Sequence, residues 1–161
     1  MKKPYVKKFA YYKDDILYDV NIVTDKIARS KMFQDKSNIE HCEQIQSSDI
    51  EPDASLISSL LNKYASMIAS RCGVYVTGYT NDSSELIYEM EFPISWIEIF
   101  SRELDDAIRD YIVNSILSEY LSIVEPAESP RYLDNASQAY SNIKKCITAR
   151  IAGTVFRPAQ P

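Results

Sequence analysis

Glycine is scarce in this sequence. The 161-residue chain contains three glycines, Gly73, Gly78 and Gly153, where an average composition of roughly 7% would give several times more. Loops that bind phosphate groups need several glycines, because their backbone N–H groups must approach the anion without a Cβ atom in the way. No G-x-G-x-x-G or G-x-x-x-x-G-K motif occurs. We therefore expect no nucleotide-dependent chemistry and no cofactor.

Histidine and cysteine are also rare. His41 is the only histidine and it adjoins Cys42, whereas metal ligands are usually separated by at least two residues. The three cysteines, Cys42, Cys72 and Cys146, form no C-x-x-C pair and are typical of reduced thiols in an intracellular protein. The residues that would make up a metal site or a catalytic triad are missing, so we expect that the protein is not an enzyme.

Long apolar runs are absent. No stretch approaches the roughly 20 apolar residues that span a bilayer, and the N-terminus has neither the apolar core nor the cleavage site of a signal peptide. Apolar residues make up 45% of the chain and charged residues 25%, which is typical of a globular domain with one hydrophobic core. The composition predicts a single domain over residues 1–161 that does not contact membranes.

The charges are unevenly distributed. The net charge is −5, both ends of the chain are basic, and the middle, residues 98–125, is acidic. Because nucleic-acid-binding domains are normally basic, nucleic-acid binding is not the predicted main function. Within the acidic middle, Glu103, Asp106 and Asp110 share one helix face. No Glu-x-x-His motif accompanies them, so we expect this face to meet solvent or a partner rather than a metal ion.

Two segments in the first half of the chain have helical spacing. Residues 14–32 carry an apolar residue at every third or fourth position, although β-branched residues leave a strand as the alternative. Residues 52–72 form a clean amphipathic pattern that Gly73 ends. The polar stretch 33–51 between them predicts a long connection or a short helix followed by a loop.

The second half contains two further predicted helices. The longest apolar stripe runs over residues 94–124, with a break near Ser101 as one alternative, and Pro126 closes the segment. A last helix is predicted over residues 129–151, with Ser129 as its N-cap and Pro130 in its first turn.

The period of the pattern changes in residues 74–92. There, apolar and polar residues alternate, and Asn81, Asp82, Ser83 and Ser84 supply turn chemistry. We predict a β-hairpin that packs on the helices or pairs with another chain. The fold class is therefore mainly α: a small bundle of about four helices, over residues 14–151, with one β-hairpin and extended terminal arms at 1–13 and 152–161.

Aromatic residues in the arms and hairpin suggest a function in protein contacts. Tyrosine and arginine are enriched where proteins meet, and a basic end facing an acidic middle suits head-to-tail contacts between identical subunits. The aromatics of the N-terminal arm need cover, either from this fold or from a neighbour. The candidate interface residues are Tyr5, Phe9, Tyr11, Tyr12, Tyr75, Tyr79, Phe156 and Arg157.

The stretch AIRDYIVNSILSEYLSIVEPAESPRYLDNASQAYSNIKKCITAR carries a resemblance to a known family. Its apolar pattern resembles the C-terminal helical pair of head-to-tail connector (adaptor) proteins of tailed bacteriophages, of the kind found in phages of Bacteroides-type hosts, including crAss-like phages. The resemblance covers about two-thirds of the chain, and the long polar connection and basic N-terminal arm depart from it. The residues that carry it are Tyr111, Ile112, Val113, Leu117, Tyr120 and Leu121, then Tyr140, Ile143 and Lys144.

The resemblance implies a structural protein of the virion. Members of this family form a ring, often of twelve subunits, that contacts the portal protein and the next tail or ring protein, while viral DNA only passes through the channel. The expected function is therefore that of a ring subunit connecting the phage portal to the tail. The alternative is a small helical adaptor or regulatory protein that binds a protein partner through its arms.

Overall fold

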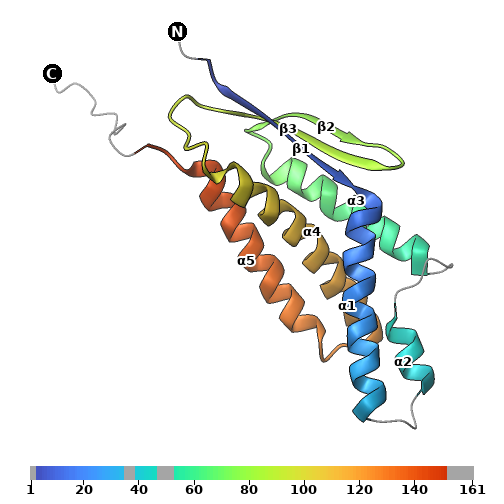
Figure 1. Ribbon diagram of the computed structural model, residues 1–161. Helices are drawn as coiled ribbons and strands as arrows, with labels where there is room; N and C mark the ends of the chain where they lie inside the picture. The colour runs from blue at the N-terminus through green and yellow to red at the C-terminus, as the bar shows by residue number, and fades with distance from the viewer. Residues whose placement is uncertain (1–2, 35–38, 47–52, 152–161) are drawn as a thin grey trace.

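A computed structural model describes residues 3–34, 39–46 and 53–151 of the chain. In this part, five helices form one layer, and one small antiparallel sheet lies across one end of it (Figure 1). The mainly helical fold class is confirmed, and the sheet has one strand more than the predicted hairpin. The elements are β1 (Tyr5–Tyr12), α1 (Lys13–Gln34), α2 (Ile39–Ile45), α3 (Asp53–Arg71), β2 (Val76–Asn81), β3 (Glu85–Phe92), α4 (Phe100–Val124) and α5 (Ser129–Thr148).

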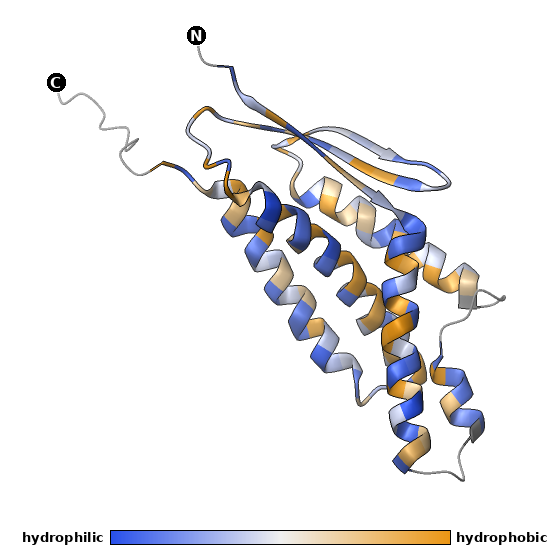
Figure 2. Ribbon diagram, viewed as in Figure 1, coloured by the Kyte–Doolittle hydropathy of each residue, from blue (hydrophilic) through white to orange (hydrophobic). Residues whose placement is uncertain are grey.

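Helix α4 lies at the centre of the helical layer. It packs along α5 and also contacts α3 and α1, because apolar residues recur over most of its circumference. Ile108, Ile112, Ile116 and Leu121 are fully buried along its length. In Figure 2, the apolar residues of α4 lie on the side toward α1, whereas the visible face of α5 is mostly hydrophilic. The other helices are therefore arranged around α4.

The predicted helices are confirmed, with shifted ends. Ile16, Val20 and Ala28 of α1 are fully buried on one side of a helix, so the strand alternative for this segment was wrong. Helix α4 begins at Phe100 rather than at residue 94. Ser129 is not the N-cap of α5, because its hydroxyl donates to the carbonyl of Ser118, 2.8 Å away, while Pro130 lies in the first turn as predicted.

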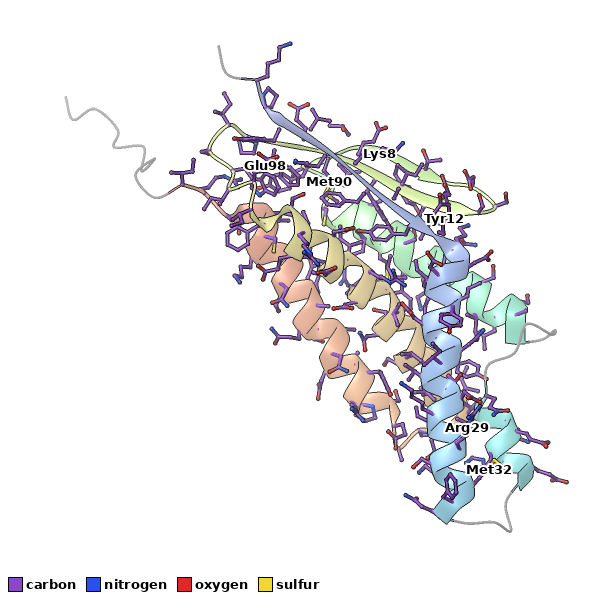
Figure 3. All side chains as sticks on the ribbon, viewed as in Figure 1. Lys8, Tyr12, Arg29, Met32, Met90 and Glu98 are labelled. Carbon is purple, nitrogen blue, oxygen red and sulfur yellow. The ribbon has the colours of Figure 1, made fainter. Side chains whose placement is uncertain are left out.

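The segment expected to be an N-terminal arm is a strand of the fold. β1 pairs antiparallel with β3 along its whole length, and β2 pairs with the other edge of β3, which gives the order β1-β3-β2. The side chains of β1 alternate, since Phe9 and Tyr11 point to the helices and are buried. In Figure 3, Lys8 and Tyr12 mark the exposed side of this strand. The fold itself thus supplies the cover for these aromatics.

The hairpin of β2 and β3 has the predicted turn. The Asp82 carboxylate accepts hydrogen bonds from the backbone N–H groups of Ser84 and Glu85, at 2.8 and 2.7 Å. These bonds lower the pKa of Asp82. The hairpin packs on α3, where the buried Tyr88 hydroxyl donates to the Ala65 carbonyl at 2.9 Å. The helices therefore stabilise the hairpin, because two strands alone are only marginally stable in water.

Two predicted features fall partly or wholly outside the described residues. The polar connection contains the short helix α2, as one of its two alternatives predicted. The C-terminal arm, residues 152–161, lies outside the described residues, as do Phe156 and Arg157. Among the residues that are described, no helix combines the length and apolar character needed to cross a bilayer.

A pair of substitutions on β1 tests whether it belongs to the core. We expect Phe9→Ala to lower the free energy of unfolding by about 3 to 5 kcal/mol, because a buried aromatic is replaced by a cavity. Val6 is 65% exposed on the same strand, so the control Val6→Ala should change stability by about 0.5 kcal/mol or less. Urea denaturation followed by circular dichroism measures both, and equal small effects would contradict the placement of β1.

Candidate protein-interaction surface

Trp96 joins the sheet to the end of α5. It lies in the connection between β3 and α4, and its indole stacks on the ring of Phe92 with a centroid separation of 4.1 Å. The ring of Tyr5, the first residue of β1, meets it edge-on at 6.0 Å. The indole N–H donates to the carbonyl of Cys146 in the last turn of α5, at 2.8 Å. One buried side chain thus holds three segments that are distant in sequence.

The chain that follows α5 is hydrogen-bonded to the segment that contains Trp96. Arg150 forms an isolated antiparallel bridge with Trp96, and the backbone N–H of Ile151 donates to the carbonyl of Ser95 at 2.9 Å. The guanidinium of Arg150 also donates to the hydroxyl of Tyr75 at 3.1 Å. The start of β1 and the end of the described C-terminal segment therefore lie at one end of the molecule (Figure 1).

Exposed apolar side chains are found on the segments that meet there. Val74 is 96% exposed and Ile99 82% exposed, and Ile94 and Ile151 are each about half exposed. We call these four residues the terminal surface. Single exposed apolar residues are ordinary, but four on segments joined by the Trp96 contacts are typical of a surface that meets another protein.

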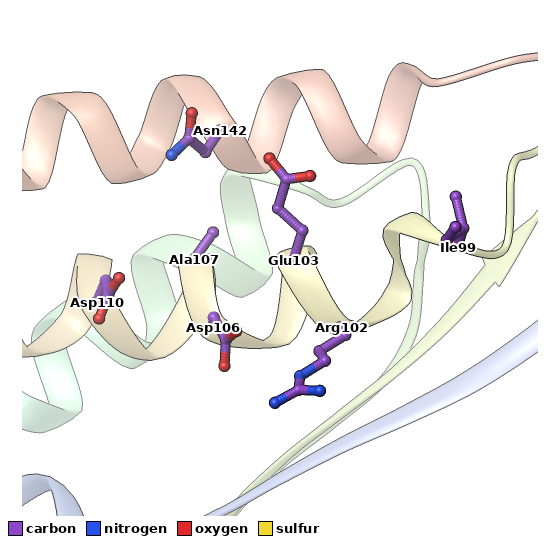
Figure 4. A pocket seen from close by; sticks show the side chains of 7 residues that line it. All are labelled: Ile99, Arg102, Glu103, Asp106, Ala107, Asp110 and Asn142. Carbon is purple, nitrogen blue, oxygen red and sulfur yellow. The ribbon is translucent and has the colours of Figure 1, made fainter.

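An acidic hollow borders the terminal surface. It has a volume of about 370 Å³ and lies between the first turns of α4 and the later part of α5 (Figure 4). Figure 4 shows Glu103 pointing toward α5, where it accepts a hydrogen bond from Lys145 at 3.0 Å. Neither Asp106 nor Asp110 forms an ion pair with another described residue. The lining residues are Ile99, Arg102, Glu103, Asp106, Ala107, Asp110 and Asn142.

The environment of Asp110 is unfavourable to its negative charge. Burial raises the pKa of its carboxyl, and the neighbouring charge of Asp106 raises it further, while Arg109 acts in the opposite direction. Arg109 is already engaged, since its guanidinium donates twice to the Asp19 carboxylate of α1, at 2.9 and 2.7 Å. A cation placed in the hollow would relieve this repulsion.

The predicted interface residues fall into different environments. Phe9 and Tyr11 are buried in the chain's own core, and the Tyr11 hydroxyl donates to Asp105 at 2.7 Å. Their burial corrects the expectation that they are exposed to a partner. Tyr12 is 61% exposed, but it lies at the far end of β1, next to α1.

Three further candidates are half-buried tyrosines. Tyr5 contacts Trp96, and Tyr75 stacks on Phe92 with a centroid separation of 5.7 Å. Both tyrosines therefore pack against the aromatic residues at the end of the molecule that carries the terminal surface. Tyr79 stacks on Tyr88 at 5.3 Å, and its buried hydroxyl has no hydrogen-bond partner among the described residues. Trp96 was not among the predicted residues, although a lone tryptophan next to a helix start is a signal for an anchoring residue.

The residues once considered for catalysis have structural contacts. His41 lies 2.8 Å from the carboxylate of Glu125, at the end of α4, and Lys31 lies 3.6 Å from the other oxygen of that carboxylate. Within residues 3–34, 39–46 and 53–151, no group of three or more His, Cys, Asp and Glu side chains is placed to hold a metal ion. The three cysteines are free and buried, and burial raises the pKa of Cys72 and of Cys146 to about 11.

Comparison with protein-family models, with curated proteins and with solved structures found no match for this chain.

The pKa of Asp110 leads to a pH-dependent prediction. Because this pKa is higher in the folded than in the unfolded state, the charged carboxylate lowers stability above the folded pKa, and the cost disappears as pH falls below the unfolded value. We expect Asp110→Asn to increase the free energy of unfolding at pH 7, and the gain to shrink as the solution is acidified.

Denaturant titrations between pH 3 and pH 8 measure this effect. The control is Asp134→Asn, which removes an exposed acid from α5. A gain that is the same at every pH, or that appears equally in the control, would contradict the electrostatic origin.

Proposed function

We propose that this protein is a structural component of a tailed-phage virion, a subunit of the ring that connects the portal to the tail. The observation that carries the proposal is the terminal surface: both ends of the described fold meet at Trp96, beside exposed apolar side chains. A surface of this kind suits a protein whose function is to hold neighbours.

The rest of the described fold suits a rigid wedge. The buried side chains form one cluster that runs from the sheet through α1, α3, α4 and α5. Because a closely packed interior deforms little, the described fold should transmit strain from one end to the other. Opposite charges are exposed near one another, because the acidic hollow lies on α4 while Lys144 and Arg150 lie near the end of the described chain. Complementary charges of this kind favour head-to-tail contacts, which close into rings.

The resemblance of residues 107–150 to connector proteins gives the proposal its biological setting. In that setting the ring contacts the portal protein on one side and the next tail or ring protein on the other. A connector subunit functions through contacts with other proteins. The apolar terminal surface and the acidic hollow are suited to such contacts. The virion is then where the protein acts.

The mass of the purified protein tests this proposal. We expect closed rings, with a mass of about 220 kDa for twelve copies of the 18.4 kDa chain. Native mass spectrometry at low micromolar concentration measures the mass, and electron microscopy shows whether the rings are closed. A chain that stays monomeric and binds a single peptide partner would instead favour a small adaptor protein.

Truncation separates assembly from folding. Removing residues 152–161 should leave the circular dichroism spectrum and the unfolding midpoint unchanged, because the shortened chain keeps Ile151 and its hydrogen bond to Ser95. The truncated protein should form fewer and smaller assemblies. Loss of the fold on truncation would show that the segment belongs to the core, and unchanged assembly would show that it does not hold neighbours.

A further inference from the structure

A groove lies on the surface of the helical layer between α3, α4 and α5. It has a volume of about 460 Å³, which is large enough to take side chains of another molecule. Because α3 and α5 both pack on α4, α4 forms the floor of the groove and the other two helices form its walls. Small side chains are frequent along it: Ser115, Ser118, Ala136, Ser137 and Ser141.

An oriented guanidinium lies at one end of this groove. Arg71 is the last residue of α3, and its guanidinium carbon lies 4.8 Å from the ring centroid of Tyr140 and 5.9 Å from that of Tyr111. Its Nη1 also donates to the Tyr111 hydroxyl at 3.1 Å. Contacts with rings from two other helices hold the guanidinium in one orientation at the groove, although the residue itself is exposed.

The positive charge of Arg71 is not balanced within the groove. Arg71 is the one charged residue among the described residues that line it, and it forms no ion pair with another described residue. The carboxylate of Glu119 is already paired with Lys63, 2.6 Å away. Lys144 adds a second cation, 5.0 Å from the ring centroid of Tyr140. This end of the groove is therefore positive, although the chain as a whole carries a net charge of −5.

The remaining donors of Arg71 fit a carboxylate. A guanidinium donates from Nε, Nη1 and Nη2, and among the described residues only Nη1 has a hydrogen-bond partner. Nε and Nη2 form a planar fork that pairs with a carboxylate. Arg109 uses the same two nitrogens to bind the carboxylate of Asp19, at 2.9 and 2.7 Å. A single guanidinium suits one carboxylate, whereas phosphate groups are usually recognised by arginine clusters.

The opposite end of the groove is apolar. Leu133 lies seven residues before Tyr140 on α5, which places it about 10 Å from the end that carries Arg71. It is 57% exposed. Met67 lies one turn before Arg71 on α3 and is half-buried in the same groove, where its unbranched side chain can adapt to an apolar partner.

We propose that this groove binds an amphipathic helix of another protein through one carboxylate and one apolar side chain. The carboxylate pairs with the Nε and Nη2 fork of Arg71, and the apolar side chain packs against Leu133 and Met67. Residues seven positions apart on a helix share one face and lie about 10 Å apart, which matches the separation of the two ends of the groove. This contact does not require ring assembly, so it goes beyond the proposed function and can be tested separately.

Fluorescence anisotropy with a designed peptide tests the contact. The probe is a fluorescein-labelled, alanine-rich helical peptide that carries one glutamate and, seven positions later, one leucine. We expect saturable binding to the full-length chain, and Arg71→Gln should weaken it about tenfold because the charge-assisted pair is lost. The control, Arg131→Gln, removes an exposed arginine from the hollow between α1 and α5 and should leave binding unchanged.

A second peptide, with glutamine in place of the glutamate, identifies the group that Arg71 binds. It should bind the wild-type chain about tenfold more weakly than the first peptide does, and it should bind Arg71→Gln and the wild type equally, because the pair is already broken. Leu133→Glu tests the apolar end independently and should also weaken binding of the first peptide. Circular dichroism checks that each variant is folded.

Binding of the first peptide that does not saturate, or that is equal for the wild type and Arg71→Gln, would overturn the proposal. Native mass spectrometry of Arg71→Gln gives a further outcome. Loss of an assembly that the wild type forms would also overturn it, because a second copy of this chain would then be the occupant of the groove. A wild-type chain that stays monomeric but binds the peptide as expected would overturn the proposed ring and support this contact.

Discussion

The contact between Trp96 and Phe92 determines how the two layers of the fold meet. The indole is fully buried, stacks on β3, touches the first residue of β1 and donates its N–H to the last turn of α5. Its burial removes a large apolar surface from water, while the hydrogen bond satisfies the polar group that a tryptophan brings into a core. This contact therefore links the sheet to α5 at the end where the terminal surface forms.

The central helix and the sheet depend on this anchor in different ways. α4 is buried by α1, α3 and α5 over most of its length, so its position is fixed by packing. The sheet is small, and both of its outer strands are edges. It is held by side chains that point toward the helices: the Tyr11 hydroxyl donates to Asp105 of α4, and the Tyr88 hydroxyl donates to the carbonyl of Ala65 in α3. Stability is therefore concentrated between the layers, which leaves the outer side chains of the terminal surface available for a partner.

Local patterns predicted the helices and hairpin, and long-range contacts account for what they missed. The spacing of Ile108, Ile112 and Ile116 is visible in sequence, as is the turn at Asp82. The pairing of β1 with β3 joins residues about eighty positions apart. The alternation in residues 5–12 indicates a strand but does not indicate which strand it pairs with. For the same reason, the burial of Phe9 and Tyr11 could not be foreseen. The acidic face of α4 was recognised, but the hollow also includes Asn142 of α5, and the place of that residue depends on how α4 and α5 pack.

Hydrogen exchange measured by mass spectrometry over a range of protein concentrations tests the central claim, that this protein works by holding copies of itself, most directly. The account predicts that amides around Val74, Ile94 and Ile99, in the terminal surface, become protected as the concentration rises, while those of α1 remain unchanged. Exchange at these three sites that is equally fast at every concentration, or protection that persists on dilution to the monomer, would contradict it.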